Sequence, residues 1–237
     1  MSRASLPHGS GCRLPGGYRV IIFDCNGVLV DGETITTTVA AEEFSRAGFP
    51  MTPLTIARFF TGRRAADMIA EVEAATGRKL PADFADTLAA ATLQRIRAEL
   101  RATPHAAYAL TWLRGPKCVA SSTTPERIRL SLETTGLMRF FETNLFSATE
   151  VTRGKPAPDL FLHAANRMGI EARDCIVVED SPVGVAAAAA AGMTAIGFVG
   201  GSHVHSHLPA QLTAAGARTV IADMRALKAA AVALRGW

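Results

Sequence analysis

The chain has 237 residues and a formal net charge of +4, and 49% of its residues are hydrophobic while 19% are charged. This composition excludes a disordered chain, because disordered segments have too few apolar residues to build a core. Aromatic residues make up only 6%, which argues against a stacking platform for single-stranded nucleic acid. The basic excess is small and scattered, so we expect no nucleic-acid partner. No apolar run approaches the roughly 20 residues of a membrane span, so we expect no membrane partner.

The segment 1–17 is rich in Gly, Ser and Pro and lacks the apolar stretch of a secretory signal. We interpret it as a mobile leader. Cys12, Cys25, Cys118 and Cys175 form no CxxC pair, and three of them lie in or beside apolar stretches, where cysteine behaves as a small buried hydrophobe. We therefore expect reduced thiols and a cytoplasmic location rather than a disulfide or zinc framework.

Short apolar runs, rich in β-branched residues, predict strands that are buried on both faces of a parallel sheet. These runs span residues 18–23, 117–120, 175–178 and 193–199. Apolar spacing and Pro and Gly end signals predict helices between them, over residues 125–137, 158–168 and 183–191. Strands that alternate with helices predict an α/β fold with a Rossmann-like, doubly wound parallel sheet.

The stretch 33–103 breaks this alternation, because it contains no convincing strand. Apolar residues at helical spacing cover 39–47, 65–75 and 81–100. A long helical insertion directly after the first strand predicts an all-helical cap domain over 33–103. The Rossmann-like core would then consist of 18–32 and 104–237, with hinges at 31–33 and 102–104.

Polar side chains stand where the predicted strands end. Asp24 and Ser121 follow the first two runs, Glu179 and Asp180 follow the third, and Lys155 lies between two helices. In a doubly wound sheet the ligand binds beyond the carboxyl ends of the strands. Carboxylate oxygens suit Mg²⁺, and a lysine offsets the charge of a phosphate. The set therefore predicts a site for Mg²⁺ and a phosphorylated ligand, although each residue alone also fits a helix cap or a surface position.

Four motifs carry a family resemblance. They are Phe-Asp-Cys-Asn-Gly-Val-Leu-Val-Asp-Gly-Glu at 23–33, Val-Ala-Ser-Ser at 119–122, Gly-Lys-Pro at 154–156 and Val-Val-Glu-Asp-Ser-Pro-Val-Gly at 177–184. From residue 18 onward the chain resembles the haloacid dehalogenase superfamily, in the helical-cap branch that includes beta-phosphoglucomutase and phosphoglycolate phosphatase. The resemblance implies a Mg²⁺-dependent phosphatase that acts on a small phosphorylated metabolite through an aspartyl phosphate.

The resemblance also implies roles for single residues. Asp24 would be the nucleophile, and Lys155 would join it to the phosphoryl group and stabilise charge in the transition state. Ser121, with Ser122 beside it, would bind the phosphoryl oxygens. The expected magnesium ligands are Asp24, the backbone carbonyl of Asn26, Asp180 and, directly or through water, Glu179.

One cap segment, Phe60-Thr-Gly-Arg-Arg, resembles the loop that reaches the substrate in this branch. Gly62 and Arg63 are therefore candidate substrate-binding residues. Arg63 or Arg64 would hold a carboxylate or a second phosphate of the substrate. The alternative is that both arginines are solvated at a helix start.

Asn26 departs from the family pattern, which has Asp two residues after the nucleophile. That Asp protonates the leaving oxygen and then activates water, and an amide can do neither. Such acid–base catalysis contributes ~10² to 10⁴ in rate. Three explanations stay open: a natural change in a slow or repurposed protein, a replacement that traps an intermediate, or deamidation of Asn26-Gly27 back to Asp. The alternatives to a phosphatase are a catalytically impaired phosphate-binding protein and, further, a phosphosugar mutase.

Gly32 and a run of alternating histidines are two smaller features of the sequence. Gly32 stands where the family has Ser, and we interpret it as a permissive hinge of the cap. His203, His205 and His207 alternate, which would put them on one side of an extended segment as either a metal site or plain surface. His203 is also a candidate substitute for the missing acid. No feature of the sequence sets the oligomeric state or names the substrate.

Overall fold

The computed structural model describes residues 18–234, so the predicted leader 1–17 and Cys12 lie outside the described residues. Six parallel strands form one sheet in the order β3-β2-β1-β4-β5-β6. The order reverses between β1 and β4, which creates the crevice where doubly wound sheets bind ligands. The strands are β1 (Val20–Phe23), β2 (Lys117–Ser121), β3 (Leu145–Ser147), β4 (Cys175–Glu179), β5 (Thr194–Phe198) and β6 (Thr219–Ile221).

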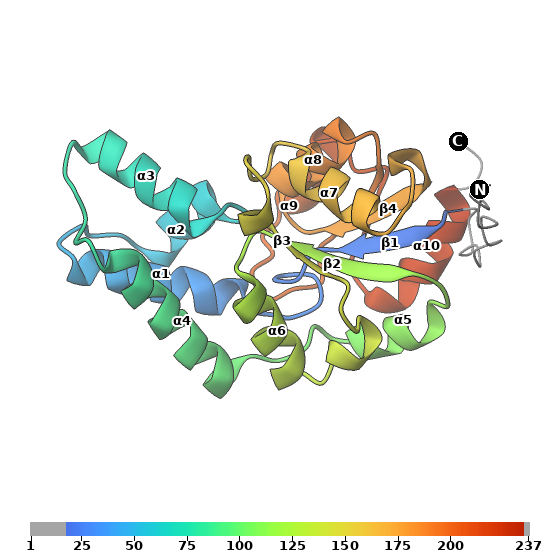
Figure 1. Cartoon of the computed structure of the whole chain (residues 1–237), viewed down its shortest axis with the longest axis horizontal. Coiled ribbons are helices and arrows are strands. Elements are labelled where there is room, and N and C mark those ends of the chain that lie inside the picture. Colours follow the sequence, from blue (N-terminus) through green and yellow to red (C-terminus); the bar gives the residue numbers. More distant parts are fainter. Residues whose placement is uncertain (1–17, 235–237) are drawn as a thin grey trace, which may run out of the picture.

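Helices cover both faces of this sheet, which confirms the predicted α/β fold class (Figure 1). Successive residues of a strand point to opposite faces, and β1 shows this clearly. Ile21 and Phe23 belong to one buried hydrophobic cluster, and Val20 and Ile22 belong to another. The covering helices are α5 (Ala106–Trp112), α6 (Pro125–Thr134), α7 (Asp159–Arg167), α8 (Pro182–Ala190), α9 (Leu208–Ala214) and α10 (Leu227–Ala233).

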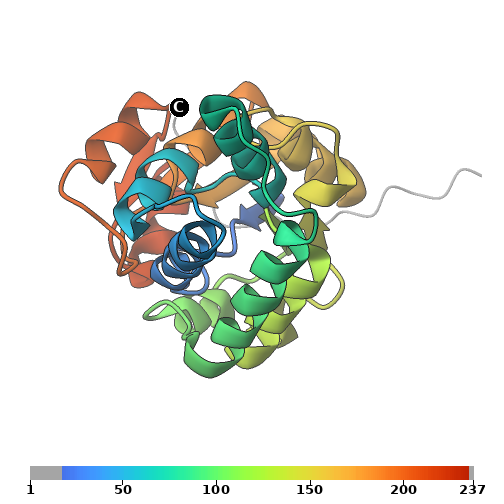
Figure 2. The ribbon, with the colours of Figure 1, turned by 90° about the vertical axis from the view of Figure 1, so that its left-hand side faces the viewer.

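Four further helices lie beyond one end of the sheet, at the left of Figure 1 and in front of the strands in Figure 2. They are α1 (Glu33–Arg46), α2 (Pro53–Phe60), α3 (Ala65–Thr76) and α4 (Phe84–Glu99). They enclose a hydrophobic cluster of their own, in which the ring centroids of Phe44 and Phe84 are 4.7 Å apart. All four helices fall inside the predicted insertion 33–103, and we call them the cap.

The chain enters and leaves the cap at one place. The Asp31 N–H donates to the Arg101 carbonyl at 2.9 Å, and Val30 and Ala102 form an antiparallel bridge. The predicted hinges therefore lie side by side.

The described residues carry two further observations that bear on the sequence analysis. Cys25, Cys118 and Cys175 are free and buried, and burial raises the pKa of each thiol. No helix between residues 18 and 234 is both long enough and apolar enough to cross a membrane.

Candidate active site

Asp24 stands at the centre of the sheet edge, directly after β1. Its N–H donates to the Val178 carbonyl of β4 at 3.0 Å, which continues the strand pairing up to the functional side chain. The chain then turns back, since the Gly27 N–H donates to the Val30 carbonyl at 2.7 Å. Gly27 has φ +82, and a Cβ there would overlap the Asp180 carboxylate. Only glycine allows both this torsion and this close approach.

Lys155 joins two of the strand ends. Its Nζ donates to Asp24 Oδ1 and to Glu179 Oε1, each at 2.6 Å, and the lysine side chain is fully covered. Burial lowers the pKa of Lys155, but the two carboxylates outweigh this and hold that pKa above its usual range. Burial raises the pKa of Asp24 to about 6, although the Lys155 ammonium opposes this shift.

Glu179 positions the Lys155 side chain by accepting a hydrogen bond from its ammonium group. While Oε1 accepts from Lys155, Oε2 accepts from the Ser181 N–H at 2.8 Å and from the Ser181 hydroxyl at 2.9 Å. A Cβ at Gly184 would overlap the same carboxylate. Both oxygens of Glu179 therefore already have hydrogen-bond donors.

Asp180, in contrast, keeps a buried oxygen without a hydrogen bond. Its Oδ2 lies 2.9 Å from His203 Nε2, but neither atom has a hydrogen-bond partner among residues 18–234. Carboxylate oxygens of Asp24, Glu179 and Asp180 lie within 4.8 Å of one another. Burial, with Glu179 and Asp24 next to it, raises the pKa of Asp180 well above its usual value. A buried carboxylate oxygen that accepts no hydrogen bond and lies beside two other carboxylates suits a hard cation such as Mg²⁺.

A hollow of about 450 Å³ lies between these strand ends and the cap. Asp24 and Ser121 are at its base, and the Ser121 hydroxyl makes no hydrogen bond to a residue between 18 and 234. Ser121 is buried at the end of β2, on the neighbouring strand. The other lining residues from the core are Asn26, Ser122, Thr123, Thr124, Glu126, Arg127 and Thr149, and Glu33 joins them from the first position of the cap.

The cap closes the hollow with mostly apolar side chains of its helices and with one loop. The Ser122 hydroxyl donates to the Gly62 carbonyl of this loop at 2.7 Å, so two predicted substrate-binding residues meet across the boundary between cap and core. Arg63 lines the hollow, and its Nη1 pairs with Glu71 at 2.6 Å. Arg64 likewise pairs with Asp67 at 2.8 Å. Both arginines thus already have carboxylate partners within the cap.

The Asn26 side chain faces the start of the cap. Its Nδ2 donates to Glu33 Oε1, the first residue of α1, while its Oδ1 lies where a Cβ of Gly32 would be. Gly32 has φ −113, which any residue adopts. Close approach to Asn26 therefore accounts for this glycine, and its interpretation as a hinge of the cap stays a prediction. Burial, together with Asp180, raises the pKa of Glu33 to about 8.

The histidine run does not form the metal site that its spacing allows. Residues 201–207 form turns rather than an extended segment. His203 lies against Asp180, and the rings of His205 and His207 lie 6.4 Å apart. Among the described residues, the strand-end carboxylates are the only group of three that could hold a metal ion.

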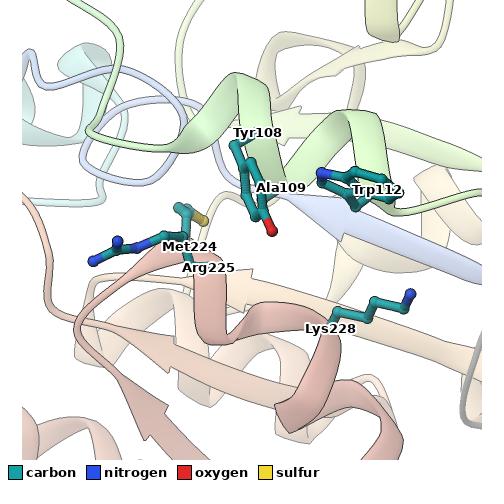
Figure 3. Close-up of a pocket in the computed structure, with 6 residues that line it drawn as sticks. All are labelled: Tyr108, Ala109, Trp112, Met224, Arg225 and Lys228. Atoms are coloured by element: carbon teal, nitrogen blue, oxygen red, sulfur yellow. The ribbon is translucent and has the colours of Figure 1, made fainter.

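A second hollow, of about 210 Å³, lies at the opposite end of the molecule from the cap (Figures 1 and 3). Tyr108 and Trp112 of α5 face Arg225 and Lys228 across it (Figure 3). Arg225 pairs with Asp223 at 2.6 Å. None of the strand-end residues borders this hollow, so it carries none of the chemistry described above.

Sequence reasoning missed two residues of the hollow. The sequence motif at 23–33 marks Glu33 only as the start of the cap, and no motif includes Arg127. Both line the hollow from the core side or from the hinge. The one sequence signal for Arg127 is its position in the first turn of the predicted helix 125–137, which follows the predicted strand 117–120.

Comparison with known proteins adds independent findings. Residues 18–192 match the family model of the haloacid dehalogenase-like hydrolases. The chain is 30% identical to 6-phosphogluconate phosphatase of Escherichia coli over 184 residues, which cover 77% of this chain and 83% of that protein. It is 30% identical to validoxylamine A 7'-phosphate phosphatase of Streptomyces hygroscopicus, over 76% of this chain and 85% of that protein.

Solved structures agree with these matches. A conserved haloacid dehalogenase-like protein of unknown function from Agrobacterium tumefaciens superimposes with a TM-score of 0.78 at 35% identity. The superposition covers 92% of this chain and 99% of that one. The likeness therefore spans both the sheet and the cap.

Proposed function

Since the chain belongs to the haloacid dehalogenase-like hydrolase family, we propose that it hydrolyses the phosphate ester of a small metabolite, with Asp24 as the nucleophile. The relatives named above are phosphatases of small phosphorylated compounds. One observation carries the proposal: Lys155 donates a hydrogen bond to Oδ1 of Asp24, while the Asp24 side chain also lines the hollow, as Ser121 does. A carboxylate that is fixed on one side and open on the other is suited to in-line attack.

The reaction takes two displacements. In the first, a carboxylate oxygen of Asp24 forms a bond to phosphorus, and the bond from phosphorus to the ester oxygen breaks. The leaving oxygen takes a proton from water, because Asn26 cannot supply one, and departs as an alcohol. In the second, water attacks the phosphorus of the aspartyl phosphate, which releases inorganic phosphate and restores Asp24. Splitting one hard displacement into two lowers each barrier.

The surrounding side chains bind and orient the phosphoryl group. The Ser121 hydroxyl donates to one of its oxygens, and the Lys155 ammonium stabilises the charge that develops there. Mg²⁺ would be held by Asp24, Asp180 and the backbone carbonyl of Asn26, with Glu179 close by, and it would neutralise phosphoryl charge. The buried Oδ2 of Asp180, which accepts no hydrogen bond within residues 18–234, supports this assignment.

Asn26 is the residue that we expect to limit the rate of hydrolysis. Its amide donates to Glu33 and has no titratable proton for the leaving oxygen. Esters whose leaving group needs protonation, such as alkyl phosphates, should therefore turn over slowly. The same observation favours a second candidate, a protein that binds phosphorylated ligands without turnover.

The test is turnover of an alkyl and an aryl phosphate with Mg²⁺, by the chain as it stands and by Asn26→Asp. We expect Asn26→Asp to raise turnover of the alkyl ester by ~10² or more, and that of the aryl ester much less, because an aryl oxide leaves without a proton. Asp24→Asn should abolish both activities. Equal, small gains on the two esters would contradict the role given to residue 26.

Two further results separate the candidate functions. Binding of inorganic phosphate without turnover by either protein would favour the second candidate. Peptide mass mapping of residue 26 shows whether Asn-Gly deamidation has restored Asp, which would account for activity of the unmodified chain.

A further inference from the structure

Three cationic side chains line the hollow above Asp24: Arg63, Arg64 and Arg127. Arg63 pairs with Glu71, and Arg64 pairs with Asp67 through two hydrogen bonds. The guanidinium of Arg127, in contrast, makes no hydrogen bond or ion pair with any residue from 18 to 234. Of the three, it alone has all its donors available to a ligand.

Arg127 is also held in a defined place. It is the third residue of α6, and its N–H donates to the Thr124 hydroxyl that caps the helix. The Arg127 side chain is half-buried. Burial lowers the pKa of its guanidinium, and Glu33 is the strongest of the charges that oppose this shift. A half-buried guanidinium without a hydrogen-bond or ion-pair partner is stabilised when an anion binds it.

The shape of the hollow sets what that anion belongs to. Asp24 and Ser121 lie at its base, whereas Arg127 lines the core side together with Glu126 and Thr123. The cap side of the lining includes Ile56, Met68 and Leu88, which offer no charge. A substrate whose phosphoryl group rests on Asp24 therefore finds one uncommitted cation along the remaining wall.

We propose that Arg127 binds a second anionic group of the substrate, so that the natural substrate is a phosphorylated acid rather than a neutral sugar or polyol phosphate. The inference rests on the proposed function and names the substrate class of the same site. The recognised chemistry is an oxyanion with two coplanar acceptor oxygens, which a carboxylate or a second phosphate supplies and the guanidinium fork matches. This assigns to Arg127 the role that the sequence suggested for Arg63 or Arg64.

The experiment compares binding of matched ligands with Mg²⁺ by calorimetry, in an Asp24→Asn background that prevents turnover. The probes are 6-phosphogluconate, glucitol 6-phosphate, which replaces its carboxylate by a hydroxymethyl group, and glucose 1,6-bisphosphate, which carries a second phosphate. Charge-assisted hydrogen bonds contribute enough to change affinity by roughly 10- to 100-fold. We expect 6-phosphogluconate, glucose 1,6-bisphosphate or both to bind tighter than glucitol 6-phosphate by that factor. The ligand that binds tighter shows whether Arg127 prefers a carboxylate or a second phosphate.

Arg127→Gln should remove this preference, and Arg127→Lys should retain part of it because the charge remains without the fork. Arg129→Gln is the matched control, since Arg129 lies on the same helix with 57% of its side chain exposed, and it should change nothing. A parent protein without the preference would overturn the inference. So would an equal loss of inorganic phosphate affinity in Arg127→Gln, since that result would place Arg127 on the transferred phosphoryl group.

Failure of the underlying function gives a different result. If neither the chain nor its Asn26→Asp variant binds inorganic phosphate or turns over an aryl phosphate, the phosphatase proposal falls and the inference on Arg127 falls with it. If phosphate binds and the aryl ester turns over while the ligand preference is absent, only the inference on Arg127 is wrong.

Discussion

The ion pairs at the strand ends and the ion pairs in the cap differ in how far they are exposed to water. The side chain of Lys155 is fully covered and lies between two carboxylates, whereas 27% of the Arg63 side chain is exposed and its partner Glu71 is 47% exposed. Buried ion pairs are sensitive to loss of one member, while exposed pairs contribute little. Substitution should therefore be costly at the buried ion pairs of the strand ends and tolerated at the partly exposed ion pairs of the cap.

The largest effect is expected at Lys155. Lys155→Met removes the donor of two hydrogen bonds and leaves Asp24 and Glu179 facing each other in a buried place. The free energy of unfolding should fall by about 3–5 kcal/mol, as when one partner of a buried pair is removed, and turnover should be lost. Denaturant unfolding measures the first effect. Lys79→Met, at an exposed pair with Glu73, is the control and should cost less than about 1 kcal/mol. Equal costs at both sites would remove the contrast.

A second test asks whether the cap is a separate stability unit. Phe44 is fully buried in the cap cluster, against Phe84. Phe44→Ala should cost about 3 kcal/mol, the low end for this change, because a thin layer of helices can partly collapse around the cavity. Amide hydrogen exchange should accelerate in α1 and α4 and stay unchanged in β1 and β4. Uniform acceleration across the sheet would mean that cap and core unfold together.

The smallest effect is expected at Arg63. Arg63→Gln breaks a partly exposed pair with Glu71, so the free energy of unfolding should change by less than about 1 kcal/mol. Its KM for a phosphorylated acid should change far less than that of Arg127→Gln, because Arg63 already has a carboxylate partner. Steady-state kinetics of the two variants in the Asn26→Asp background gives the comparison. A larger KM change at Arg63 would move the anion contact from the core wall to the cap.

Much of the fold was accessible from sequence because buried parallel strands leave a clear mark. β1, β2, β4 and β5 are apolar runs that end in polar or glycine residues, and each was predicted within a few residues. β3 and β6 were missed because each has only three residues, too few for a periodic signal. Helix α2 was not predicted, although its start is recognisable. The Thr52 side chain caps the helix, and Pro53 is its first residue.

The candidate site was also predictable from the sequence in part only. That Asp24, Ser121, Glu179 and Asp180 approach one another follows from a general rule for the ends of parallel strands, and the structure brings them to one edge of the sheet. The hydrogen bonds of Lys155 to Asp24 and Glu179 required the fold, because these residues are distant in sequence. Arg127 stood out only when its neighbours were known, since an unpaired cation is defined by what does not contact it.

The pairing of Asp31 with Arg101 has a consequence for how such proteins diversify. Because the chain enters and leaves the cap through adjacent residues, replacing the whole insertion would leave β1 and the residues directly after it in place. The exchange is not entirely free, since Ile96 and Leu100 at the end of the cap pack into the core cluster beneath the sheet. A new cap would have to bring two apolar residues of its own to that place, and it would change only the part of the hollow's lining that the cap supplies.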